Sequence, residues 1–126
     1  STSNPCSIAQ EAARAALEGD QGCVAEMVVA FKERHEFVVS ELNKIDGVEC
    51  IPADGTFYAF PSFQGVIDAR SDISNDIELA EYLLQEAGVA LVPGSAFGAP
   101  GNRRLSFATS KDVLADAIDR IAKALA

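Results

Sequence analysis

The chain has 126 residues, 48% of them hydrophobic, and a formal net charge of −9 from ten Lys and Arg against nineteen Asp and Glu. This length suits one domain with one compact core. The longest apolar runs, such as 89–92, are far shorter than the roughly 20 residues of a membrane-spanning helix. The few basic residues are scattered, which argues against nucleic acid or an anionic membrane as a partner. These features predict a soluble cytoplasmic protein.

Few residues suit metal or redox chemistry. The cysteines at 6, 23 and 50 form no Cys-x-x-Cys pair and indicate small, buried or half-buried residues in a reducing compartment. His35 is the only histidine and has no partner at ligand spacing, so we expect it at a core edge and predict no metal site. The chain lacks an initiator Met and enters a helix cap within a few residues, so we expect a piece of a longer chain, or a processed one.

The first half of the chain predicts two helices followed by two strands. Apolar spacing favours a short helix over 8–18, opened by a capping box of Ser7 and Gln10, and a long helix over 22–44 that Gly47 ends. Residues 48–51 and 56–60 are rich in strand formers, and the Asp54-Gly55 turn joins them as a hairpin. The segment 61–75 is typical of a loop.

The second half predicts a helix, two strands and a last helix. Asn75 and Glu78 are expected to cap a helix that Gly88 closes. The run 89–92 predicts a strand buried on both faces, and alternation predicts another over 104–108. Thr109 or Ser110 caps the final helix. This order predicts an α/β (α+β) two-layer fold, with a small mixed sheet and helices packed on one face. Residues expected to point inward from the two helices are Ile77, Ala80, Leu83, Leu84, Ala87, Leu114, Ala117, Ile118, Ile121 and Leu125.

Arg104 is one candidate binding residue. Its strand places it on one face with Ser106 and Ala108, two small residues that leave space in front of the guanidinium. A planar fork of donors in such a gap suits a carboxylate, which it holds with two parallel hydrogen bonds. The alternative, which spacing alone favours, is a surface arginine at the end of a strand. Arg103, on the other face, is expected to be a surface residue of that kind.

A second candidate lies at 54–58, where Gly55 precedes two aromatic residues and would let the backbone approach a ligand. A hairpin turn with core aromatics is the alternative, and it is favoured locally. The sequence has no glycine-rich phosphate loop and no Ser-His-Asp set. All four lysines, at 32, 44, 111 and 123, lie in polar helical surroundings, so none suits a Schiff base.

Three segments together resemble one family. Residues 84–98 followed by 104–110 look like the C-terminal part of class I/II aminotransferases. Residues 54–61 resemble the Gly-x-Phe-Tyr strand of that family, and 1–10 resemble the segment that leaves its large domain. The matches occur in the family's order along the whole chain, and bacterial aspartate aminotransferases of fold type I are the nearest in appearance.

The resemblance implies a role for several residues. The chain would be the aminotransferase small domain over 1–126, with 1–7 as the connection from a missing large domain. Arg104 would bind the α-carboxylate of the amino-acid substrate. Gly55 and Phe57 would lie at the moving edge that closes over the substrate. Ser3 and Asn4 would lie near a dimer interface, close to the neighbouring active site.

The resemblance also implies an activity for the full-length protein. It would be a homodimeric, pyridoxal-phosphate-dependent enzyme that transfers amino groups between amino acids and 2-oxo acids, of the aspartate:2-oxoglutarate type. The family's Schiff-base lysine lies in the large domain, so this chain would hold no catalytic residue, bind no cofactor covalently and be inactive alone. The alternatives are another enzyme of this fold, such as an aromatic aminotransferase or a cyclopropane-carboxylate synthase, and a non-catalytic amino-acid-sensing module or regulator.

Overall fold

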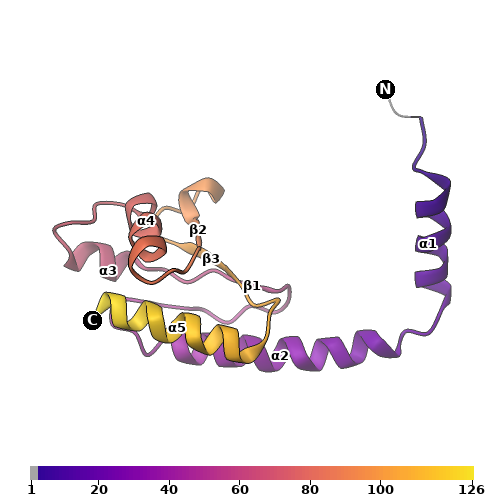
Figure 1. Cartoon of the computed structure of the whole chain (residues 1–126), viewed down its shortest axis with the longest axis horizontal. Helices are drawn as coiled ribbons and strands as arrows, with labels where there is room; N and C mark the ends of the chain where they lie inside the picture. Colours follow the sequence, from indigo (N-terminus) through magenta and orange to yellow (C-terminus); the bar gives the residue numbers. More distant parts are fainter. Residues whose placement is uncertain (1–2) are drawn as a thin grey trace. The chain divides into compact units, whose positions relative to one another are not determined.

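A computed structural model describes residues 3–126. The chain forms two units, one up to Ala30 and one over Phe31–Ala126. Figure 1 shows the elements in chain order. The helices are α1 (Ser7–Glu18), α2 (Gly22–Leu42), α3 (Gln64–Ala69), α4 (Asp76–Glu86), the 3₁₀ helix η1 (Gly94–Phe97) and α5 (Lys111–Leu125); the strands are β1 (Tyr58–Ala59), β2 (Val92–Pro93) and β3 (Arg103–Ser106).

The first unit holds α1 and the beginning of α2. The predicted helix over 8–18 is confirmed, but its predicted capping box is wrong. Cys6 occupies the N-cap position without a side-chain hydrogen bond. The Gln10 side chain donates to the carbonyl of Pro5 at 2.9 Å, whereas in a capping box it would accept from the backbone amide of the N-cap residue. No residue of α1 is buried, and Ile8 and Leu17 are about four-fifths exposed. The apolar side of α1 therefore has no cover within the part of the chain that the structure describes.

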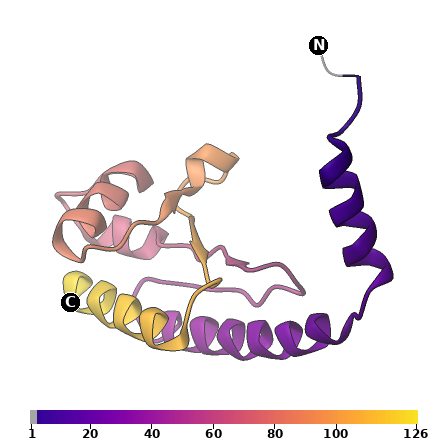
Figure 2. The ribbon, with the colours of Figure 1, turned by 45° about the vertical axis from the view of Figure 1, so that its right-hand side comes forward.

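The second unit contains the hydrophobic core. The later part of α2 and α5 run side by side in both views (Figures 1 and 2). The predicted inward stripe of α5 is confirmed, with Leu114, Ile118 and Ile121 buried. Tyr82 on α4 donates its hydroxyl hydrogen to the carbonyl of Ala124 at 2.8 Å, which ties α4 to α5. Other core residues are Val38, Leu42, Val48, Phe63, Val66, Ile67, Ile73, Leu79, Leu83, Leu91, Leu105 and Phe107.

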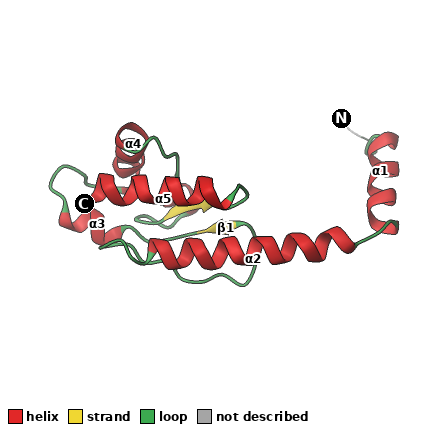
Figure 3. Ribbon diagram, turned by 60° about the horizontal axis from the view of Figure 1, so that its bottom comes forward, coloured by secondary structure: helices red, strands yellow, loops and turns green. Residues whose placement is uncertain are grey.

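The sheet has three short strands in the order β1-β3-β2, and both strand pairs are antiparallel. Figure 3 colours the strands yellow and labels β1. Tyr58 lies opposite Ser106, and Val92 lies opposite Arg104. The α/β fold class is confirmed, but the sheet, predicted to be mixed, is antiparallel. Side chains alternate along β3, so Leu105 faces the core while Ser106 is exposed.

The predicted hairpin between 48–51 and 56–60 is wrong. Residues 48–51 form no strand, and the bridge that Glu49 makes is with Ser62, beyond the second segment. The Asn43 side chain accepts from the amide of Cys50 at 2.8 Å and donates to its carbonyl at 2.9 Å. These bonds occupy the backbone groups that a sheet partner would need. The neighbour of β1 is therefore β3.

Three other expectations differ from the structure. The segment predicted as loop over 61–75 contains α3, whose six residues are too few to show a helical period. The strand predicted at 89–92 begins only at Val92, which is 37% exposed, so this run is not buried on both faces. On α4 the buried face is formed by Asp76, Leu79 and Leu83. Ile77 and Leu84, predicted to point inward, are more than half exposed.

Candidate carboxylate site

Arg104 lies at the centre of a half-exposed aromatic cluster. Its guanidinium carbon is 4.5 Å from the ring centre of Tyr58 and 4.7 Å from that of Phe97. The two rings come from opposite sides of the central strand, Tyr58 from β1 and Phe97 from the turn after β2. Within residues 3–126, no hydrogen bond or ion pair joins the Arg104 guanidinium to another side chain. Its donors are therefore available to a ligand.

Further contacts hold the two rings beside Arg104. Phe57 packs on Tyr58 with 4.4 Å between ring centres, and Phe60 meets Phe97 edge-on at 6.0 Å. The amide of Phe107 donates to the carbonyl of Phe57 at 2.9 Å, which fixes the start of β1 against the end of β3. Each cation–π contact contributes about 0.5–1 kcal/mol at an exposed site. The cluster therefore orients the guanidinium without neutralising its charge.

Arg103 is fully buried, which corrects the expectation of a surface residue. It shares the inward face of β3 with Leu105, so the alternation that turns Arg104 outward turns Arg103 into the core. Its guanidinium donates to the backbone carbonyl of Asp76 and lies 5.9 Å from the ring centre of Phe63. Its Nε and Nη1 atoms have no partner among the described residues. Burial lowers the pKa of Arg103 to about 10, against the opposing effect of the Asp76 charge.

Asp76 is the second buried charged residue of this region, at 3% exposure. Its carboxylate accepts a hydrogen bond from the amide of Ser95 in η1 at 2.8 Å. Burial acts to raise the pKa of Asp76, but the hydrogen bonds from Ser95 and the nearby Arg103 charge outweigh it, so the pKa lies below its ordinary value. Asp76 therefore stays ionised and connects the start of α4 to the turn that carries Phe97.

Gly94 allows that turn to pack closely against the strand end. Its amide donates to the carbonyl of Asn102 at 2.8 Å, and the amide of Ala99 donates to the carbonyl of Gly94 at 3.0 Å. A Cβ at Gly94 would clash with the carbonyl oxygens of both Ala99 and Asn102. Only glycine fits this close approach of backbones.

The structure brings some of the predicted site residues together. Phe57 packs on Tyr58, and the Tyr58 ring lies against the Arg104 guanidinium. Gly55 lies in the exposed loop before β1, with open space around the position a Cβ would take. Ser3 and Asn4 are exposed residues of the first unit. The next residue after Gly55, Thr56, has a φ of +67°, a left-handed conformation that a β-branched residue rarely adopts.

The sequence interpretation missed four residues of this region. Tyr58 was expected to be a plain strand or core residue, and Phe97 was given no role. Two aromatic residues on segments that flank an arginine strand are a signal for a cation–π cluster. Asp76 carried no sequence signal for its contact with Arg103, because that contact depends on how α4 crosses β3.

His35 lies at the edge of the core, as predicted. Its Nε2 atom accepts from the amide of Ala53 at 3.0 Å, and its ring centre is 5.7 Å from that of Phe107. No group of three or more His, Cys, Asp or Glu side chains that could hold a metal ion occurs among the described residues. The histidine therefore anchors the loop before β1.

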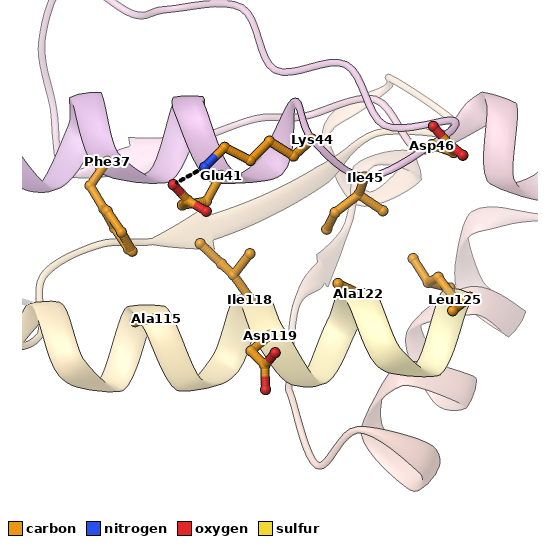
Figure 4. A pocket seen from close by; sticks show the side chains of 11 residues that line it. Phe37, Glu41, Lys44, Ile45, Asp46, Ala115, Ile118, Asp119, Ala122 and Leu125 are labelled. Carbon is orange, nitrogen blue, oxygen red and sulfur yellow. Dashed lines mark hydrogen bonds and ion pairs between the residues drawn. The ribbon is translucent and has the colours of Figure 1, made fainter.

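A groove of about 720 Å³ lies elsewhere, between the end of α2 and α5. Figure 4 shows Phe37 and Ile45 projecting from one side toward Ile118 on the other, with the Lys44–Glu41 ion pair above them. Arg104 does not line this groove. The groove is therefore separate from the aromatic cluster.

The four lysines do not suit covalent attachment of a carbonyl cofactor. All four are exposed, and Lys44 and Lys123 form ion pairs at 2.6 Å with Glu41 and Asp119. Pairing with Asp119 raises the pKa of Lys123, which is the opposite of what a nucleophilic amine requires.

In residues 3–126, no helix is both long and apolar enough to cross a membrane.

Comparison with known proteins identifies the family. The family model for aminotransferase class I and II matches residues 1–121. The chain belongs to this family. An aspartate/prephenate aminotransferase of Nitrosomonas europaea is 50% identical over 130 aligned positions, which cover 99% of this chain and 33% of that protein.

Two solved structures also match the chain. The aspartate aminotransferase of Rhizobium meliloti aligns with a TM-score of 0.90 and 42% identity, over 98% of this chain and 32% of that one. A putative PLP-dependent β-cystathionase from Corynebacterium diphtheriae aligns with a TM-score of 0.70 and 32% identity, over 80% of this chain and 26% of that one. The chain thus spans about a third of the length of the relatives it matches.

Proposed function

We propose that this chain is the C-terminal small domain of an aminotransferase and that Arg104 binds the α-carboxylate of the amino-acid substrate. The observation that carries the proposal is a half-exposed guanidinium, held by Tyr58 and Phe97, that has no acidic partner among the described residues. Its N–H donors match a carboxylate in charge and in planar geometry. Membership of the aminotransferase class I and II family supports this assignment.

The reaction we propose is the transfer of an amino group from aspartate to 2-oxoglutarate by a cytoplasmic homodimer. Pyridoxal phosphate, when bound, supplies the electron sink for this chemistry. The residues of this chain do not fit its attachment, because all four lysines are exposed. Arg104 would act by fixing the substrate's orientation, and a substrate held in place reacts faster because the entropy of alignment is already lost.

The other predicted residues complete the proposal. Gly55 lies in the exposed loop before β1, and Phe57 follows it and packs on Tyr58 in the aromatic cluster. At this place a moving edge would close over the substrate and exclude water. Ser3 and Asn4 would contribute to the contact with the second subunit. Free cysteines at 6, 23 and 50 favour a reducing compartment.

Kinetics of the full-length protein test the role of Arg104. Removing a charged, bidentate hydrogen bond costs on the order of 2–5 kcal/mol, so Arg104→Ala should lower kcat/KM for L-aspartate by roughly a hundredfold or more. Arg70→Ala is the matched control, because Arg70 also stacks on a tyrosine, at 4.2 Å from the ring centre of Tyr82, but lies outside the cluster. An unchanged kcat/KM in Arg104→Ala, or an equal loss in the control, would return Arg104 to an ordinary surface residue.

A second experiment concerns the reaction itself, because one matched structure carries the name of a β-cystathionase. Incubating the full-length protein with L-aspartate and 2-oxoglutarate should yield glutamate and oxaloacetate in equal amounts. Release of ammonia and pyruvate from cystathionine, without glutamate formation, would show a lyase instead.

A further inference from the structure

Asp76 and Phe97 belong to different elements that one short turn connects. The Asp76 carboxylate accepts from the amide of Ser95 at 2.8 Å, and Ser95 is the second residue of η1. Phe97 is the last residue of the same four-residue helix. Its ring is the one that lies 4.7 Å from the Arg104 guanidinium carbon. The buried Asp76 carboxylate is therefore connected to the half-exposed Arg104 guanidinium through three residues of one turn, Ser95 to Phe97.

Asp76 itself is firmly held. It occupies the first position of α4, directly after the N-cap Asn75, whose side chain accepts from the amides of Ile77 and Glu78 at 2.9 and 3.0 Å. The Asp76 residue is buried, and the Arg103 guanidinium donates to the backbone carbonyl of Asp76. A buried, hydrogen-bonded carboxylate on a capped helix is a rigid anchor for whatever it binds.

We propose that Asp76 is a positioning residue for the Arg104 site. Its carboxylate fixes the Ser95 amide, and through it the orientation of η1, so that the Phe97 ring stays against the guanidinium. This inference rests on the proposed function insofar as the bound carboxylate is that of the substrate. Asp76 does not touch the ligand, and its effect reaches the ligand only through Phe97 and Arg104.

The turn has other tethers, so loss of the Asp76 contact acts locally. The Gly94 amide still bonds to Asn102, and the Ala99 amide still bonds to Gly94. Between these tethers, Ser95 and Phe97 gain freedom to turn. A displacement of about 1 Å in a binding group is enough to reduce catalysis substantially.

Enzyme kinetics on the full-length protein test this proposal. We expect Asp76→Ala to raise KM for L-aspartate about tenfold and to change kcat less than threefold, because the arginine remains but is less well placed. Asp76→Asn should raise KM less, because its amide oxygen can still accept from Ser95. Asp72→Asn is the matched control, an exposed carboxylate whose ion pair is with Arg70, and it should leave KM unchanged.

A double-mutant cycle tests the path through Phe97. Phe97 is about half exposed, so Phe97→Ala leaves the core intact. If Asp76 acts through Phe97, the double variant Asp76→Ala/Phe97→Ala should have the KM of Phe97→Ala alone. Multiplicative effects on KM, or an unchanged KM in Asp76→Ala while Arg104→Lys raises it, would overturn the proposal and leave the proposed function standing.

Hydrogen exchange separates this inference from the proposed function. In Asp76→Ala, amide exchange in the segment 93–99 should accelerate at least tenfold more than exchange in α5, which reports the loss of global stability. Equal acceleration across the whole protein would show general destabilisation and would overturn the positioning role. If the full-length protein transfers no amino groups, the proposed function fails, and exchange in 93–99 still decides whether Asp76 holds the turn.

Discussion

Arg103 and Arg104 are consecutive residues whose guanidinium groups occupy opposite faces of β3. One is fully buried and bonded to the backbone of Asp76, and the other is half exposed against Tyr58 and Phe97. The same side-chain chemistry therefore serves two purposes one residue apart. Arg103 packs in the core that supports the aromatic cluster, and Arg104 presents its guanidinium N–H donors at the surface.

The stability of the chain should depend on Arg103 and Asp76 as a pair. Asp76→Ala removes the acceptor of the Ser95 amide and a buried negative charge near Arg103, and should cost about 1–3 kcal/mol in the free energy of unfolding. Adding Arg103→Met removes the buried positive charge and should recover part of this loss, because two Arg103 nitrogens have no partner among the described residues. Urea unfolding of the two variants measures this. A double variant less stable than Asp76→Ala would contradict the pairing.

Acid should act partly through Asp76. Its pKa is lower in the folded chain than in the unfolded chain, so its contribution to stability is complete above the unfolded pKa of about 3.9 and is lost as the pH falls through the folded value. Asp76→Asn should therefore be less stable than the native chain at pH 7, and the difference should shrink below about pH 4. Thermal unfolding of both proteins from pH 7 to pH 2 measures this difference in stability. A constant difference would show that Asp76 does not titrate in this way.

Thr56 should be a point of backbone strain. Its φ of +67° costs a residue with a branched Cβ roughly 1–2 kcal/mol. Thr56→Gly should therefore raise the free energy of unfolding by about 1 kcal/mol despite the greater freedom of glycine in the unfolded chain. Thr109→Gly, at a position without positive φ, is the control and should be destabilising. A loss of stability in both variants would show that Thr56 is not strained.

Thiol reactivity should separate Cys50 from the other cysteines. Cys6 and Cys23 are exposed, whereas Cys50 is buried and burial raises the pKa of its thiol. Because the thiolate is the reactive form, a disulfide reagent at pH 7.5 should label two thiols of the folded chain quickly and the third only after denaturation. Cys50→Ala should keep both fast thiols and lose the slow one. Three fast thiols would show that the segment around Asn43 opens readily.

Periodicity predicted the parts of the fold that repeat over several turns. The stripe of α5 and the capped start of α4 at Asn75 were both recognisable, because each depends on residues close together in sequence. The prediction of a strand at 48–51 was wrong, because strand propensity does not account for hydrogen bonds from a nearby side chain to the backbone. A single amide side chain, Asn43, bonds to both backbone groups of Cys50 and so competes with the sheet.

The outward position of Arg104 was predictable, and its surroundings were not. The small neighbours of Arg104 in β3 pointed to a gap in front of the guanidinium, and the resemblance to a family pointed to the same residue. Arg103 was misplaced because an arginine is expected at the surface, although the alternation along β3 already put it on the face of Leu105. Asp76 and Ser95 are 19 residues apart, and only the crossing of α4 and η1 brings them together.

The aromatic setting of Arg104 has a consequence for the exchange of ligands. An arginine held by an internal carboxylate must break that ion pair each time a ligand arrives, and the internal group competes for the guanidinium each time a ligand leaves. Tyr58 and Phe97 hold Arg104 through their ring faces and carry no carboxylate. The rings thus preorganise the guanidinium, and under the proposed function a carboxylate would arrive and leave without a rival carboxylate among the described residues.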